Sequence, residues 1–404
     1  MKRIVIFCDG TWNTASAEHP TNVVLLSRAL MPVDTDDIPQ IPIYVPGVGS
    51  GRRGVTALGR WSDQVLGGIM GLGLMENVVE AYLHLVFLYE PGDEIFIFGF
   101  SRGAYTARSL TGLIRSTGIL DRSRLNLLDE VVTRYRAGTE DTHPRTEASR
   151  AFRLRVSPHV MTSEGDRALY EAHAKTHGLI PPELLRLAYL GVWDTVGALG
   201  IPSRFGFSRL WNRRFAFHDA KLSSLVSAAR HAVALDERRR EFEPTLWDNI
   251  LDLNADSDPA DPPYQERHFA GDHGSVGGGG DITALSSIAL AWIMEGAARQ
   301  GLAFDAGVMA EFGREQDPFG PLRNRSMPET GLLARLMRRF GRDRPGPGAL
   351  EDLHPAVLDR WAFEAKDRAW EPYRPGSLRA LERELQGWVD ARLVEPGAPT
   401  SRQA

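Results

Sequence analysis

Residues 94–116 predict a buried β-strand, a sharp turn and a helix in direct succession. Glu94–Phe98 is almost wholly apolar, as expected for a strand covered on both faces. The turn Gly99–Gly103 has the pattern G-x-S-x-G around Ser101, and Ala104–Ser116 has a helical pattern. So sharp a turn favours glycine on both sides of the serine, because a larger side chain would collide with the strand or the helix. This arrangement is typical of a mostly parallel sheet flanked by helices.

The rest of the chain repeats the alternation of short apolar strands and longer helices, so we predict the α/β class with a mostly parallel sheet. The other predicted strands are Ile4–Phe7, Ile41–Val45, Leu187–Trp193 and Arg267–Ala270. The other predicted helices are Thr21–Leu30, Met75–Tyr89, His218–Leu235, Ile282–Ala298 and Ser377–Leu393.

The sheet pattern ends near residue 300, which predicts one domain over residues 1–300 and a helical C-terminal extension, 301–404, packed on it. Within that domain, the polar, arginine-rich stretch at about 120–180 predicts an insertion. Residues 201–217 are candidates for a lid. Asp343–Gly348 is rich in proline and glycine and predicts a linker.

Composition excludes several classes of protein. The 404 residues carry 47 Lys and Arg against 52 Asp and Glu, a net charge of −5, which argues against binding nucleic acid. The single cysteine, Cys8, can form neither an internal disulfide nor a multi-cysteine zinc site. We find no signal peptide and no apolar run long enough to span a bilayer. These features predict a cytoplasmic protein, and they leave open export by a secretion system that needs no signal peptide.

A serine at such a turn can act as a nucleophile if a histidine accepts its proton and an acid orients that histidine. Chain order in this class of turn is serine, acid, histidine. Asp194 follows the buried strand Leu187–Trp193 and is the best acid candidate; the alternative is that its side chain caps the turn.

Elimination among the eleven histidines favours His273, on the glycine-rich stretch Gly271–Gly280; the alternative is a histidine of a surface loop. His218 and His231 fall in a predicted helix, His268 in a predicted strand, and His354 beyond the linker. The remaining histidines precede Asp194: His19, His84, His143, His159, His173 and His177.

Backbone N–H groups next to Ser101 predict an oxyanion hole. The N–H of Arg102 lies at the start of a helix, and the loop Asp9-Gly10-Thr11 could add the N–H of Gly10 or Thr11. The alternative is an Asx turn that closes the first strand. The same loop resembles a phosphatase motif, but Phe7 stands where the nucleophilic aspartate would be needed, so we reject that function.

Candidate substrate contacts are Phe205, Phe207 and Trp211 in the lid region. Arg52 and Arg53 are further candidates, on a loop at the rim of the site; the alternative is that these two side chains are only solvated surface charges. Leu332–Phe340 is a short basic amphipathic stretch that would suit peripheral membrane contact, or a helix packed on the domain. Asp272, His273 and Asp281 lack the spacing of a metal site, so we predict no metal and no cofactor.

Four motifs, in this order, resemble an α/β-hydrolase domain family that includes the catalytic domains of type VI secretion phospholipase effectors. They are Cys8–Asn13, Gly99–Arg108, Val192–Gly197 and Gly271–Gly279. The resemblance covers about residues 1–300, with family-like segments at Leu353–Pro355 and Tyr373–Pro375. It implies the α/β-hydrolase fold, a triad of Ser101, Asp194 and His273, and hydrolysis of phospholipid acyl esters. A small-ester hydrolase and a catalytically silent interaction protein on the same fold remain the alternatives.

Overall fold

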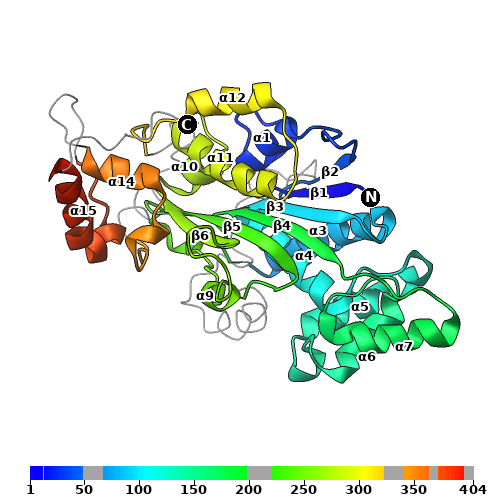
Figure 1. Cartoon of the computed structure of the whole chain (residues 1–404). Helices are drawn as coiled ribbons and strands as arrows, with labels where there is room; N and C mark the ends of the chain where they lie inside the picture. The colour runs from blue at the N-terminus through cyan, green and yellow to red at the C-terminus, as the bar shows by residue number, and fades with distance from the viewer. Residues whose placement is uncertain (12, 49–66, 198–220, 323–340, 364–371, 395–404) are drawn as a thin grey trace.

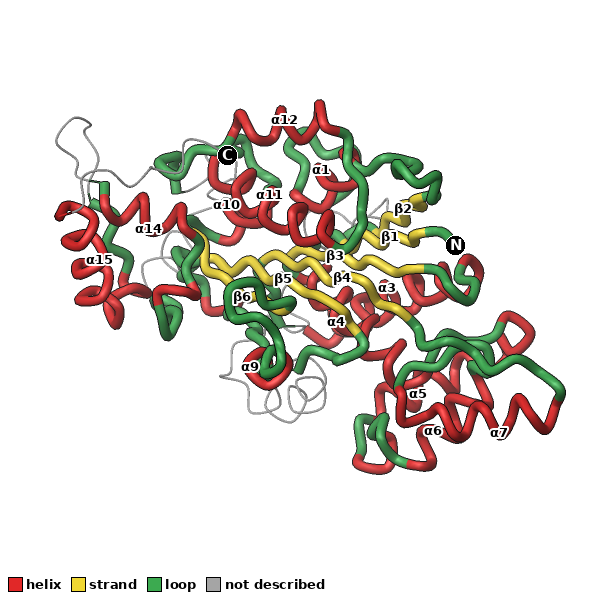
Figure 2. The backbone as a smooth tube through the Cα atoms, viewed as in Figure 1, coloured by secondary structure: helices red, strands yellow, loops and turns green. Residues whose placement is uncertain are grey.

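Six parallel strands form one sheet in the order β2-β1-β3-β4-β5-β6 in the computed structural model of the chain (Figures 1 and 2). The structure describes residues 1–11, 13–48, 67–197, 221–322, 341–363 and 372–394. The strands are β1 Arg3–Cys8, β2 Gln40–Val45, β3 Glu94–Phe100, β4 Arg186–Trp193, β5 Val226–Ala234 and β6 Tyr264–Phe269. The predicted α/β class with a mostly parallel sheet is confirmed.

Helices cover both faces of this sheet (Figure 1). They are α1 Asn22–Ala29, α3 Gly67–Leu88, α4 Arg102–Thr117, α5 Leu128–Ala137, α6 Glu147–Val156, α7 Arg167–His177, α9 Ile250–Leu253, α10 His273–Gly277, α11 Ala284–Arg299, α12 Ala306–Glu315, α14 Pro355–Ala362 and α15 Glu382–Val394. Short 3₁₀ turns are Arg122–Leu127, Glu140–Thr142, Glu164–Asp166, Arg240–Phe242, Leu350–Asp352 and Gly376–Leu381. None of the described helices is long and apolar enough to cross a membrane.

The alternation of side chains along β1 divides the interior into two cores. Ile4 and Ile6 face the core under α3 and α4, whereas Val5 and Phe7 face the core under α1 and α11. Every residue of β1 and β3 is buried, as expected for central parallel strands covered on both faces. The strand order reverses at β1, between β2 and β3, and the crevice beyond the carboxyl ends of strands at such a point is where α/β sheets bind ligands.

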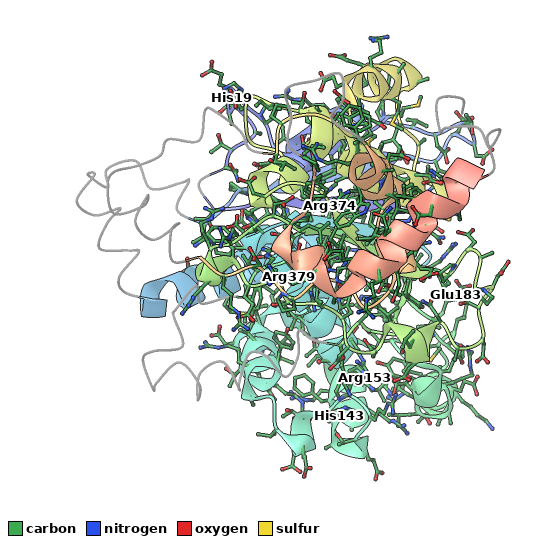
Figure 3. All side chains as sticks on the ribbon, turned by 90° about the vertical axis from the view of Figure 1, so that its left-hand side faces the viewer. His19, His143, Arg153, Glu183, Arg374 and Arg379 are labelled. Atoms are coloured by element: carbon green, nitrogen blue, oxygen red, sulfur yellow. The ribbon has the colours of Figure 1, made fainter. Side chains whose placement is uncertain are left out.

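Residues 120–180 form a helical lobe at the C-terminal end of α4 (Figure 1), whereas Ser101 precedes the first residue of that helix. Its helices α5 and α6 pack on α4, and Arg153 forms a buried two-bond ion pair with Asp166 (2.9 and 2.7 Å) inside it. Figure 3 shows Arg153 and His143 in this lobe, and Figure 1 shows the lobe and the C-terminal helices α14 and α15 at opposite ends of the molecule.

The C-terminal segments pack against the carboxyl end of the sheet. Leu353, Val357, Leu378 and Leu385 are buried in a third apolar cluster with residues that follow β5 and β6. Figure 3 looks onto this side of the molecule, with the C-terminal helices in front of the sheet near Arg374 and Arg379.

The predicted helix His218–Leu235 is wrong, because residues 226–234 form strand β5. This segment is rich in alanine, which favours a helix locally, but it lies between β4 and β6 and is buried on both faces. Tertiary packing therefore overrides local propensity, and His231 lies on a central strand.

Gly103 tests the packing of α4 on β1. A Cβ at this position would lie 2.1 Å from the backbone oxygen of Cys8, so neither partner can move aside cheaply. We expect Gly103→Ala to lower the free energy of unfolding by about 1–3 kcal/mol. The matched control is Gly313→Ala in α12, where a Cβ meets nothing within 4 Å; we expect it to raise stability by up to about 1 kcal/mol. Urea unfolding followed by tryptophan fluorescence measures both. Equal effects of the two substitutions would contradict the close approach of α4 to β1 at Gly103.

Candidate active site

Ser101 lies at the sharp turn between β3 and α4. Its φ of 58° is in the left-handed region, which stores strain in a residue other than glycine. The turn is held by the Ser101 N–H, which donates to the carbonyl of Trp193 at 3.0 Å. Gly99 is required here because a Cβ at that position would lie 2.4 Å from the Gly103 oxygen. The turn thus places Ser101 at the carboxyl end of the sheet.

Asp194 follows β4, the neighbour of β3, so the ends of these two strands lie side by side. It too has a positive φ, 39°. Its N–H donates to Ala232 at 2.7 Å, and its Oδ1 accepts from the N–H of Ala234 at 3.0 Å. These bonds to β5 fix the turn so that the carboxylate points along the edge of the sheet toward His273.

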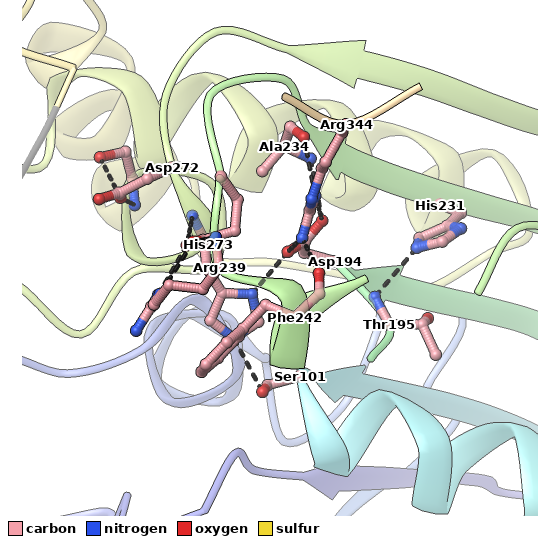
Figure 4. A network of polar contacts seen from close by, with 12 residues as sticks. Ser101, Asp194, Thr195, His231, Ala234, Arg239, Phe242, Asp272, His273 and Arg344 are labelled. Carbon is pink, nitrogen blue, oxygen red and sulfur yellow. Dashed lines mark hydrogen bonds and ion pairs between the residues drawn. The ribbon is translucent and has the colours of Figure 1, made fainter. Parts of the chain in front are cut away.

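His273 is the first residue of α10, which follows β6, and it joins the other two side chains (Figure 4). The structure places its Nε2 2.8 Å from Ser101 Oγ and its Nδ1 2.5 Å from Asp194 Oδ2. With Nδ1–H donating to the carboxylate, Nε2 accepts from the serine hydroxyl. The ring is held between Phe100 and Phe242, each with its centroid 4.6 Å away. An imidazole in this position can accept the proton of Ser101.

A buried arginine shares Asp194 with His273. Arg344 donates from Nη1 to Oδ1 at 2.7 Å and from Nη2 to Oδ2 at 2.9 Å. Burial alone would raise the pKa of Asp194, but the charge of Arg344 and the hydrogen bonds from His273 and Arg344 outweigh it and hold the pKa well below its usual range. Asp194 is therefore a carboxylate at neutral pH although its side chain has no exposed surface.

A second pair, buried His231 and part-buried Glu266, supports the residue after Asp194. His231 Nε2 accepts from the N–H of Thr195 at 3.1 Å (Figure 4). Its Nδ1 lies 2.7 Å from Glu266 Oε2. His231 falls in the segment predicted as a helix, where a triad histidine is unusual. Strand β5 instead places the imidazole against the turn that carries Asp194, in contact with the next residue, Thr195.

The loop after β1 lies against Ser101: a Cβ at Gly10 would be 3.3 Å from the Cβ of Ser101. Asp9 Oδ1 accepts from the N–H of Gly10 at 2.7 Å and from Thr21 at 2.9 Å, and Oδ2 accepts from Tyr44 at 2.7 Å. Burial raises the pKa of Asp9 although these hydrogen bonds oppose the rise. The N–H of Gly10 is thus already engaged, whereas that of Thr11 has no acceptor among the described residues.

Several predicted contacts lie outside the described residues: Arg52, Arg53, Phe205, Phe207, Trp211 and the amphipathic stretch Leu332–Phe340. Of the residues considered for a metal site, Asp272 caps α10 by accepting from the N–H and the hydroxyl of Ser275 at 3.0 and 2.9 Å. Within the described ranges, no three His, Cys, Asp or Glu side chains are grouped as they would be around a metal ion.

Sequence reasoning missed Arg344, His231 and Glu266. Arg344 lies in the segment interpreted as a linker and is separated from Asp194 by 150 residues, so no local pattern points to it. The glutamate could have been found only with the correct strand assignment, because His231 and Glu266 are cross-strand partners in β5 and β6.

A protein-family model described as "T6SS, Phospholipase effector Tle1-like, catalytic domain" matches residues 2–296. The chain is 29% identical over 248 residues to the uncharacterized protein YEL023C of Saccharomyces cerevisiae. The matched residues are 60% of this chain and 32% of that protein.

Two solved structures are similar at 16% sequence identity. One is an uncharacterized protein from Pseudomonas aeruginosa, with a TM-score of 0.42 over 99% of this chain and 60% of that chain. The other is the Tle1 effector bound to the VgrG spike from the type 6 secretion system, with a TM-score of 0.32 over 69% of this chain and 51% of that one. The chain thus spans less than two thirds of the length of each of these relatives.

The ionised state of Asp194 predicts that the stability of the fold falls as the pH is lowered. Its folded-state pKa lies below the usual 3.8, so its ion pair contributes fully above that pH and is lost as the pH falls toward the folded pKa. Asp194→Asn leaves Arg344 buried without its anion, and we expect it to cost about 3–5 kcal/mol at pH 7. Below the usual pKa, the difference in the free energy of unfolding between wild type and Asp194→Asn should shrink by about 1.4 kcal/mol per pH unit.

Urea unfolding between neutral and acid pH measures this gap. The control is Asp256→Asn, a change at an exposed position, which should follow the wild-type pH dependence. A gap for Asp194→Asn that stays constant or widens toward acid pH would show that Asp194 is not held as a buried carboxylate.

Proposed function

The chain belongs to the family of Tle1-like type VI secretion phospholipase effector catalytic domains, and on that premise we propose that it is a serine hydrolase that cleaves acyl esters of phospholipids. The observation that carries the proposal is the continuous hydrogen-bonded chain from Ser101 through His273 to Asp194, at 2.8 and 2.5 Å. The side chains come from the ends of three different strands, and all three are buried beside the point where the strand order reverses.

The proposed reaction proceeds through a covalent acyl-serine. Ser101 Oγ attacks the ester carbonyl carbon while His273 Nε2 takes the hydroxyl proton, and Asp194 stabilises the imidazolium that forms. His273 then gives the proton to the departing alcohol, and the acyl group stays on Ser101. A water molecule, deprotonated by the same nitrogen, attacks the acyl-enzyme and releases the fatty acid and free Ser101.

In this proposal the oxyanion of each tetrahedral intermediate accepts from the backbone N–H groups of Arg102 and Thr11. Arg102 is the first residue of α4, where the helix end favours negative charge. Asp9 acts on the loop by engaging Gly10, which leaves Thr11 as the donor of this loop.

Family membership supports export by a type VI system as part of the proposal. The predicted cytoplasmic location then applies to the chain before its export. The lipid substrate is supported by the same membership and by the aromatic residues between 205 and 217 of the sequence.

Ser101→Ala tests the nucleophile. We expect kcat to fall by about 10⁴-fold or more, because members of a triad act as a unit. Ser116→Ala, a change at a buried serine of the same helix, is the matched control and should keep wild-type turnover. Fatty acid released from phospholipid vesicles is measured for each, and a fluorophosphonate probe should label the wild type and the control only. Turnover by Ser101→Ala within about tenfold of wild type would refute the assignment.

Acyl length separates a lipid hydrolase from a small-ester hydrolase. Each buried CH₂ contributes about 0.8 kcal/mol, so kcat/KM should rise roughly fourfold per methylene while the chain still enters an apolar site. The measurement is kcat/KM for p-nitrophenyl esters from acetyl to dodecanoyl, with Ser101→Ala as the blank. A series that is flat or falls beyond about four carbons supports the small-ester alternative. No turnover of any ester or vesicle supports the silent interaction protein.

A further inference from the structure

The C-terminal segment 341–348 lies along the loop that follows β5. The N–H of Arg342 donates to the carbonyl of Arg238 at 3.1 Å, and the Arg238 guanidinium pairs with Asp343 at 2.9 Å. Gly346 approaches so closely that a Cβ there would lie 1.8 Å from the Ser377 oxygen. The segment is therefore fixed on both sides of Arg344.

From this segment the Arg344 side chain reaches the buried end of the sheet. Besides the two bonds to Asp194, Nη1 donates to the carbonyl of Ala234 at 2.8 Å and Nη2 donates to the carbonyl of Phe242. The guanidinium thus joins the turn after β4 to the loop after β5. That loop also carries Phe242 against the His273 ring and Glu237, which accepts from the His273 N–H at 3.4 Å.

These contacts restrict the one motion that the bonds to β5 leave to Asp194, the rotation of its carboxylate. Its backbone is held by β5, but its carboxylate could still rotate about the bond from Cβ. A planar fork with one donor on each oxygen fixes the carboxylate plane. With Arg344 occupying one side, Oδ2 is held at 2.5 Å from His273 Nδ1 (Figure 4).

We infer that Arg344 is a positioning residue for the proposed triad: it orients the Asp194 carboxylate toward His273 and neutralises its buried charge. This inference rests on the proposed function. Residues 2–296 match the family model, so the chain supplies this part of its site from outside the matched region.

A cation at this position also opposes a positive charge on His273. The charged groups of the described residues next to His273 are Asp194, which is bound to Arg344, and Glu237, which is paired with Arg239 on the loop after β5. Asp272 precedes His273, and its carboxylate is engaged by Ser275 at the start of α10. Removing Arg344 leaves the Asp194 carboxylate without an opposing cation, whereas Glu237 keeps its partner Arg239, and the unopposed carboxylate favours the imidazolium. The acid limb of the pH–rate profile should then move to higher pH.

The test compares Arg344→Met and Arg344→Lys with Arg360→Met. Arg360 is an equally buried arginine, also 7% exposed, that donates to the carbonyls of Pro318 and Gly320 and does not contact the site. For Arg344→Met we expect kcat to fall on the order of 100-fold with KM within about threefold, as for a misplaced catalytic group. Arg344→Lys keeps the charge but cannot bridge both oxygens, so we expect a smaller loss in kcat, of about tenfold, and an acid limb close to that of wild type.

A second readout needs no substrate. The low-field proton NMR signal of the His273 Nδ1–H reports its bond to Asp194 directly, and we expect it to shift or broaden in both Arg344 variants and to stay unchanged in Arg360→Met. If Arg344→Met does not fold, Arg344→Lys carries both measurements.

Wild-type kcat and an unchanged signal in the Arg344 variants overturn the inference, as does a loss that Arg360→Met reproduces. The proposed function fails separately, if wild type shows no hydrolysis that depends on Ser101; the NMR comparison then still decides whether Arg344 orients Asp194.

Discussion

The charge of Asp194 is the constraint on which the arrangement of the site depends. A carboxylate with no exposed surface is stable only if hydrogen bonds and opposite charge replace the water it has lost. Here the backbone of Ala234, the imidazole of His273 and the fork of Arg344 supply them. Each partner belongs to a different segment, so one buried charge draws together the ends of β4, β5 and β6 and the C-terminal extension.

The sheet makes that convergence available. Parallel strands end at the same edge of the sheet, so residues that follow β3, β4 and β6 by only a few positions lie close together. Strain is concentrated at the same place: within the described chain, Ser101 and Asp194 are two of the three residues other than glycine with a positive φ. The two apolar cores on either side of the sheet hold these strand ends in place against that strain.

The elements that sequence reasoning identified best are those with a local physical cause. The sequence predicts the strand Glu94–Phe98, the sharp turn at Ser101 and the helix after it, because strand burial and turn sterics act within a few residues. The segment 218–235 failed for the opposite reason. Its alanines favour a helix locally, and only pairing with β4 and β6 makes residues 226–234 a strand.

The sequence by itself determined the α/β class and the sharp turn at Ser101. Through chain order and elimination it also identified Asp194 and His273 as the candidate partners of that serine. Only the tertiary structure decided which groups hold them: Arg344 on Asp194, His231 with Glu266 under Thr195, and Asp9 on Gly10. The physical reason is range. Periodicity and turn geometry are encoded in neighbouring residues, whereas compensation of a buried charge depends on side chains that the fold brings together from as far as 150 positions away.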